Sequence, residues 1–259
     1  MKSLVLRRAV SAFFAAVLTA TAASAQVTNF STDVNTAINN GLNFMVSQGW
    51  ATNGNSGDAT GIVALAFLEK RSSADQNAPP VGYSGSTAAD QARINGMVAY
   101  MVGNAPAGFY AYRNGQEMMA LSVYIRTGGP NPGALGALNT AFDEAYNTVV
   151  GSYGTVAAWH GYFCYNNALC PDSSTTQLLI SGLAAARAVF VDNGDPVRLA
   201  RLDALTARSR QAYQANGTSN GFPNEKGHAY QAGDTGNNSL QQTASGTWIQ
   251  QVGGANLQD

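Results

Sequence analysis

The stretch WHGYFCYNNALCPDSSTTQLLISGLAAARAVF, residues 159–190, decides the fold. An aromatic turn leads through a loop bounded by two cysteines to Pro171, Asp172 and Ser173, and a long apolar segment follows. Because Asp172 is a helix-capping residue type, the sequence predicts that a helix begins there. That helix carries small or apolar residues on both faces and no broad charged stripe, which indicates that it is buried on most sides.

The same plan, an apolar helix after a polar or aromatic loop, recurs along the chain. Each such inner helix follows an amphipathic outer one, in which apolar residues recur at spacings of three and four. The expected outer helices are 33–48, 92–102, 135–150 and 197–214, and the expected inner helices are 58–70, 116–126, 173–190 and 239–252. Asp58 is expected to cap the first inner helix, as Asp172 caps the third.

The inner helices align on a polar or small residue followed five places later by a small one. The pairs are Gly61 with Ala66, Glu117 with Ser122, Gln177 with Gly182, and Gln241 with Gly246. The resulting period is close to 60 residues, which predicts four helical hairpins in an array whose units bury their apolar faces against neighbours. We expect Gly182 and Gly246 to lie at helix contacts from which side chains are excluded.

The N-terminus has the pattern of an export signal. Basic residues at the start precede the apolar run 9–21, and Ala23-Ser24-Ala25 resembles a signal-peptidase site. We therefore expect residues 1–25 to be a signal peptide and residues 26–259 to be one mature domain. The protein is expected outside the cytoplasm, in a periplasm or the extracellular space, and without a transmembrane segment.

The charge of the chain argues against nucleic-acid binding. The full sequence has 14 basic and 15 acidic side chains. Three of the basic ones, Lys2, Arg7 and Arg8, lie in the expected signal peptide, so the mature chain has a net charge of −4. Nucleic-acid binding needs a clustered basic surface to neutralise phosphates, and none is present in the sequence.

The turns Trp159-His160-Gly161-Tyr162 and Gly221-Phe222, each before an inner helix that begins DSSTTQ or NNSLQQ, resemble the prenyltransferase and squalene oxidase repeat. This repeat builds terpenoid cyclases and protein prenyltransferase β subunits. The resemblance implies an all-α protein of the α/α-toroid type, in which inner helices line a cavity and outer helices surround them. Related toroids close with about six hairpins, so four predict an open or incomplete ring. Its uncovered C-terminal edge would be completed by self-association or by a protein partner.

The chemical motifs of that superfamily are missing. Asp58, Asp172 and Asp234 are each isolated from other carboxylates, whereas squalene cyclases use Asp-x-Asp-Asp. We therefore expect a binding or structural module. The alternative is an enzyme that uses the cavity, either an atypical terpene cyclase or prenyltransferase relative or a glycan-active lyase or hydrolase. Its candidate catalytic residues are Glu117, His160, Asp172, His228 and Asp234.

The two cysteines, Cys164 and Cys170, have two interpretations. Export and close spacing favour a disulfide between them. The alternative is a zinc site made of Cys170, Asp172 and His228, which resembles the Asp-x-Cys and His ligands of protein prenyltransferases in a different order.

Aromatic residues crowd the loops before the inner helices. They either pack against helix ends or form a surface that binds a glycan or an apolar ligand. The binding candidates are Trp159, Tyr162, Tyr165, Phe222 and Tyr230.

Overall fold

The computed structural model describes residues 27–75, 77–152, 160–166, 170–219, 226–234 and 238–256, and the side chains of 149–152 are outside the description. The expected signal peptide and two of the binding candidates, Trp159 and Phe222, lie outside the described residues.

Helices dominate the described residues, which confirms the expectation of an all-α protein. The α-helices are α2 (Asn29–Ser47), α3 (Thr60–Leu68), α4 (Ala88–Asn104), α5 (Ala111–Arg126), α6 (Ala134–Ser152), α7 (Ser173–Asp192), α8 (Pro196–Asn216) and α9 (Leu240–Val252). A single 3-10 turn, η1 (Gly57–Ala59), precedes α3. The short strands β1 (Thr218–Ser219) and β2 (Lys226–Gly227) pair antiparallel between α8 and α9.

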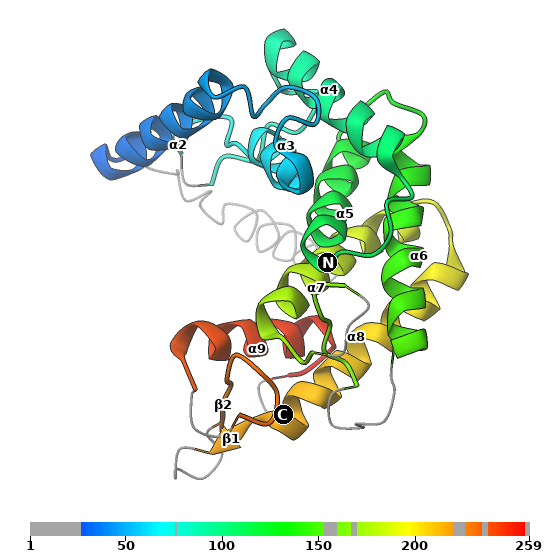
Figure 1. Ribbon diagram of the computed structural model, residues 1–259. Helices are drawn as coiled ribbons and strands as arrows, with labels where there is room; N and C mark the ends of the chain where they lie inside the picture. The colour runs from blue at the N-terminus through cyan, green and yellow to red at the C-terminus, as the bar shows by residue number, and fades with distance from the viewer. Residues whose placement is uncertain are drawn as a thin grey trace, which may run out of the picture.

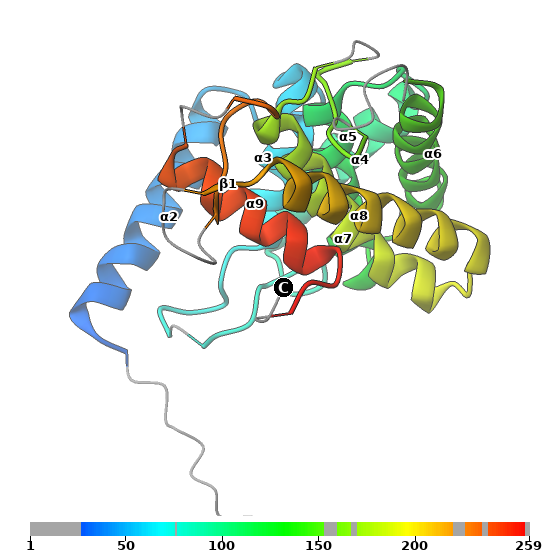
Figure 2. The same cartoon turned by 90° about the horizontal axis from the view of Figure 1, so that it is seen from below.

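The described helices form two series by their contacts, but not the pairs expected of the hairpins, because α4 and α6 pack mainly on the inner helix before them and not on the one after. Helices α3, α5, α7 and α9 pack against one another in that order, and the α5–α7 contact is the most extensive. Helix α4 packs on α3 and α6, α6 packs on α5, and α8 packs on both α7 and α9. The chain follows an arc with α2 and α3 at one end and α9 at the other (Figure 1). Seen from below, α8 and α9 lie across the molecule and α2 projects at one side (Figure 2).

Polar side chains fix most helix starts. Thr28 and Ser31 form a capping box at α2, and Thr87, Asp195 and Ser239 accept hydrogen bonds from the first turns of α4, α8 and α9. Four expected starts are wrong. Helices α2 and α4 each begin four residues early, at Asn29 and Ala88. Asp58 does not cap α3, because it lies inside η1 and the helix starts after Ala59 without a side-chain cap. Helix α5 begins at Ala111, five residues before the expected start, because the tyrosines assigned to a loop continue into the helix.

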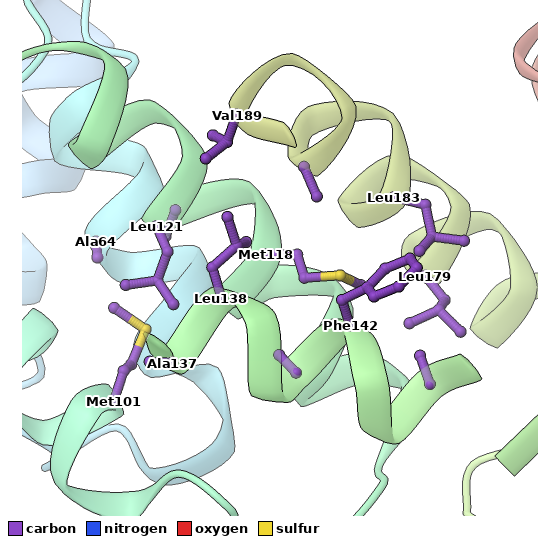
Figure 3. Packing of buried hydrophobic residues seen from close by; sticks show 14 of the residues in the cluster. Ala64, Met101, Met118, Leu121, Ala137, Leu138, Phe142, Leu179, Leu183 and Val189 are labelled. Carbon is purple, nitrogen blue, oxygen red and sulfur yellow. The ribbon is translucent and has the colours of Figure 1, made fainter. Parts of the chain in front are cut away.

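The hydrophobic core extends from α2 to α9, and Figure 3 shows its centre, where α5, α6 and α7 meet. Met118 and Leu121 from α5 face Leu138 and Phe142 from α6, and α7 adds Leu179, Leu183 and Val189, all fully buried. The Phe142 and Phe190 rings meet edge to face with centroids 5.0 Å apart.

Glycines allow the inner helices to approach closely. A Cβ atom added at Gly182 would lie 2.5 Å from the carbonyl oxygen of Gly115, and one added at Gly115 would lie 2.6 Å from that of Leu178. Gly246 is equally closed, because an added Cβ would overlap the His228 ring. The expectation that both glycines lie at helix contacts is confirmed for Gly182. Gly246 also excludes a side chain, but it does so against the His228 ring of the preceding loop and not against another helix.

One of the described helices, α7, is long and apolar enough to cross a membrane by length and hydropathy alone. Half of its apolar window is buried inside the protein, and a core helix passes the same test. Its length and hydropathy therefore carry no evidence of a membrane span.

Candidate ligand-binding site

Asp172 organises the start of α7. Its carboxylate oxygen Oδ1 accepts hydrogen bonds from the backbone N–H groups of Ser174 and Thr175, at 2.8 and 3.0 Å, and from the Ser174 hydroxyl at 2.6 Å. This confirms the predicted cap. The residue is 2% exposed, and its backbone forms bridges with Phe163 and Gln231. Asp172 therefore holds two loops, residues 160–166 and 226–234, against the first turn of α7.

Four tyrosines gather beside this helix start, and we call Tyr110, Tyr112, Tyr165 and Tyr230 the tyrosine cluster. The Tyr112 ring contacts those of Tyr110 and Tyr165, with centroids 6.0 and 5.5 Å apart. The hydroxyls of Tyr165 and Tyr230 are 3.1 Å apart. Both rings reach solvent, with Tyr165 37% and Tyr230 43% exposed. The cluster is a partly exposed aromatic surface with polar groups directed into it.

Ser174 links the cluster to Asp172. Its hydroxyl oxygen lies 2.7 Å from the Tyr112 hydroxyl and 3.3 Å from that of Tyr230. The backbone holds the same elements together, because the Ala111 N–H donates to the Tyr165 carbonyl and the Ser173 N–H donates to the Tyr230 carbonyl. These bonds fix the tyrosines on the N-terminal ends of α5 and α7.

Of the predicted binding residues, the structure brings Tyr165 and Tyr230 together. Tyr162 requires a correction. It is 8% exposed and stacks on Tyr213 with centroids 4.3 Å apart, so it belongs to the core. Burial raises its pKa. Tyr110 and Tyr112 are among the aromatics that crowd the loops in the sequence but were not among the binding candidates, and Ser174 was not predicted at all. The sequence feature that could have identified the two tyrosines as site residues is the alternation Tyr110-Ala111-Tyr112 just before an expected inner helix.

Glu117 lies on α5, one turn beyond Tyr112 and Arg113. Burial raises its pKa to about 7, against the opposing effect of Arg113 and with the help of the Glu144 and Asp58 charges. Arg113 pairs with Asp58 at 3.3 Å. A carboxyl group with a pKa near neutrality has the proton affinity that general acid–base chemistry uses.

His228 is 4% exposed and lies between α8 and α9. Its ring meets Tyr213 edge to face at 5.2 Å, and its Nε2 atom lies 3.2 Å from Nε2 of Gln250. Burial, with a smaller contribution from the Lys226 charge, lowers its pKa. The ring therefore fills a gap beside Gly246, where it packs as a core residue.

The remaining catalytic candidates lie in separate surroundings. The ring of His160 lies beside Arg208, with Nδ1 3.3 Å from its Nη1. The Asp234 N–H donates to the Gln231 carbonyl in the loop before α9. In the described part of the chain, no hydrogen bond joins any two of Glu117, Asp172 and His228.

Cys164 and Cys170 are bonded to each other, which confirms the predicted disulfide. The zinc alternative with Cys170, Asp172 and His228 therefore loses its thiolate ligand. Among the described residues, no three His, Cys, Asp or Glu side chains are grouped closely enough to hold a metal ion.

Comparison of the chain with models of protein families, with curated proteins and with solved structures finds no match. The interpretation of this site therefore rests on its own geometry.

Proposed function

We propose that this protein is an exported binding module of the α/α-toroid type and that it binds a glycan on the tyrosine cluster. One observation carries the proposal: tyrosines from three segments far apart in the sequence converge on one helix start, and their hydroxyls are joined through Ser174 to Asp172. The disulfide supports an oxidising compartment outside the cytoplasm.

The cluster suits a glycan better than a purely apolar ligand. Tyrosine combines an apolar ring face, which stacks on the apolar face of a sugar, with a hydroxyl that needs a polar partner. A hydrocarbon ligand that covered Tyr165 and Tyr230 would bury their hydroxyls without offering new hydrogen bonds, which is unfavourable. A sugar supplies those bonds.

Binding is also better supported than catalysis at this position. Asp172 is fully engaged with its own helix start, so its carboxylate is in place to support the fold and the Ser174 hydroxyl. Glu117, the group with the most suitable pKa, has no hydrogen-bonded titratable partner among the other candidates in the described residues. A general acid–base pair would need two such groups around one reacting bond.

The test is calorimetric titration of residues 26–259 with a panel of neutral oligosaccharides. For a sugar that binds, Tyr165→Ala combined with Tyr230→Ala should weaken the affinity about tenfold, since each stacked aromatic contributes on the order of 1 kcal/mol. Trp50→Ala is a matched control, because Trp50 is 43% exposed but lies in the loop after α2. Absence of binding to every sugar, or equal loss in the control, would exclude this proposal.

A second candidate is a structural role through self-association. Apolar side chains are exposed at both ends of the arc: Phe30 is 71% and Phe44 54% exposed on α2, and Leu240 is 83% and Trp248 42% exposed on α9. A groove of about 310 Å³ lies between α2 and the loop at Arg71. Exposed apolar surface of this kind favours association. Sedimentation at micromolar concentration tests it, and a monomer at all concentrations would exclude it.

A further inference from the structure

The hydrogen bonds around Ser174 have a defined direction. An ionised Asp172 carboxylate can only accept, so the single proton of the Ser174 hydroxyl is donated to Asp172 Oδ1, 2.6 Å away. The Ser174 oxygen must then act as acceptor toward its other neighbours. The Tyr112 hydroxyl, at 2.7 Å, therefore donates to Ser174.

The same reasoning extends to the outer tyrosines. The Tyr230 hydroxyl lies 3.3 Å from Ser174 and can join it only as a donor, because the serine proton is already used. Tyr230 then has no second proton, so the Tyr165 hydroxyl, 3.1 Å away, donates to Tyr230. This is the one assignment that satisfies all four contacts. The protons of these four contacts are donated toward Asp172, and the Tyr112 and Tyr165 oxygens keep lone pairs that none of the four contacts uses.

The surroundings of these oxygens are electron-rich. Aromatic faces attract cations through their quadrupole, and the cluster has two exposed rings. Burial raises the pKa of Tyr112, and Tyr165 and, to the smallest extent, the Asp172 charge raise it further. Positively charged N–H donors form stronger hydrogen bonds to such acceptors than neutral hydroxyls do.

We infer that the tyrosine cluster selects glycans that carry protonated amino groups, so that its ligand is an amino-sugar polymer with free amines. This inference rests on the proposed glycan-binding function. A protonated amine donates hydrogen bonds to the unused lone pairs, lies against the tyrosine faces and compensates the Asp172 charge. An N-acetylated or neutral sugar can donate hydrogen bonds and stack on the rings, but it brings no positive charge to the rings or to Asp172.

Three oligosaccharides of equal length test the inference: a glucosamine oligomer, its N-acetylated counterpart and a glucose oligomer. Calorimetric titration is done at about pH 6, where the amines are protonated. The glucosamine oligomer should bind about tenfold tighter than the other two. Added salt should reduce that advantage, because salt screens the charge.

Two variants test which residues cause the preference for the glucosamine oligomer. Asp172→Asn keeps an equally good helix cap and the Oδ1 acceptor but removes the charge, so the ratio of the affinities for the glucosamine and glucose oligomers should fall. Ser174→Ala removes the relay between the tyrosines and Asp172, and it should reduce the preference as well. Circular dichroism checks that each variant is folded. If Asp172→Asn does not fold, Ser174→Ala alone tests the preference for the glucosamine oligomer.

The outcomes separate the two levels of the proposal. Equal affinity for all three oligomers would overturn the amine preference and leave the glycan-binding function standing. Preference that is unchanged in both variants would also overturn it. If none of the three binds and the wider panel is also negative, the proposed function itself is wrong.

Discussion

The α5–α7 contact and the contact of α9 with the loop before it use the same device, a glycine on an inner helix, but they fill the space differently. Gly182 of α7 faces the backbone of Gly115 on α5. Gly246 of α9 faces the imidazole ring of His228, which comes from the loop before α9. A backbone cannot move without moving its helix, whereas a side chain can change its rotamer. The first contact is therefore rigid and the second adjustable.

The two contacts also differ in the polarity of the residues around them. The α5–α7 contact is flanked by buried apolar residues such as Met118, Leu179 and Leu183. Around Gly246 the neighbour is a polar ring, and α9 is held to α7 by hydrogen bonds, from Ser245 to Gln177 at 2.6 Å and from the Trp248 indole to Ser181 at 3.2 Å. The tyrosine cluster is built on the ends of the rigid pair, since Tyr112 belongs to α5 and Ser174 to α7. A binding surface gains affinity when its groups are held in place before the ligand arrives.

The largest expected effect comes from breaking the rigid contact. Gly182→Leu should destabilise the protein by about 3 kcal/mol, because overpacking against backbone outweighs the gain of about 1 kcal/mol in helix propensity. Gly41→Ala is the control, since Gly41 lies in α2 with open space around it and should gain slightly. Urea denaturation measures both. An unchanged stability of Gly182→Leu would show that this contact can adjust.

A second prediction uses the charge buried on the rigid side. The pKa of Glu117 is raised from 4.5 to about 7, so the folded protein binds its proton more tightly than the unfolded chain does. Its contribution to stability is present below pH 4.5 and is lost as pH rises to 7. The substitution Glu117→Gln should therefore change the free energy of unfolding more favourably at pH 8 than at pH 4. The difference between the two pH values should be roughly 2 kcal/mol after allowance for partial exposure. Denaturation of both proteins at the two pH values measures the difference, and a constant difference would contradict it.

The sequence predicts the two glycines but not the groups that they face. The recurrence of a small residue five places after Gln177 and Gln241 predicts the two glycines at helix contacts, and the structure places Gly182 there but Gly246 against a loop side chain. Nothing in the pattern says what each glycine faces. His228 lies 18 residues before Gly246 in a loop, and only the three-dimensional path of that loop brings its ring into the gap.

The binding site was less predictable than the fold. Hydrophobic periodicity and the Asp172 cap are local signals, and they identify the hairpins and the start of α7. The tyrosine cluster depends on contacts between residues 62 and 65 positions apart in the chain, such as Tyr112 with Ser174 and Tyr165 with Tyr230. Tyr162 was assigned to the surface because its neighbours are loop residues, but its ring turns inward and packs on Tyr213.

The adjustable contact should respond to a smaller change. Gly246→Ala adds a Cβ that overlaps the His228 ring, and the ring must move, with a loss of about 1 kcal/mol. In the double variant with His228→Ala the overlap disappears, so the two losses should not add. A double-mutant cycle by urea denaturation measures the coupling. Additive losses would show that the ring already has room to move.

The smallest expected effect is a loosening of α9 in acid, opposite in sign to the effect at Glu117. Burial holds the pKa of His228 below its ordinary 6.5, so as pH falls below that value the unfolded chain takes up protons first and stability is lost. The facing groups offer the imidazolium no compensation: α9 has no charged side chain, α8 contributes Tyr213, and Lys226 on β2 is itself positive. Amide exchange in α9 should therefore accelerate between pH 7 and 5 relative to α5, after correction for intrinsic rates. His228→Gln should remove this difference. If α9 and α5 respond alike in both proteins, the two contacts do not differ in the way the glycines suggest.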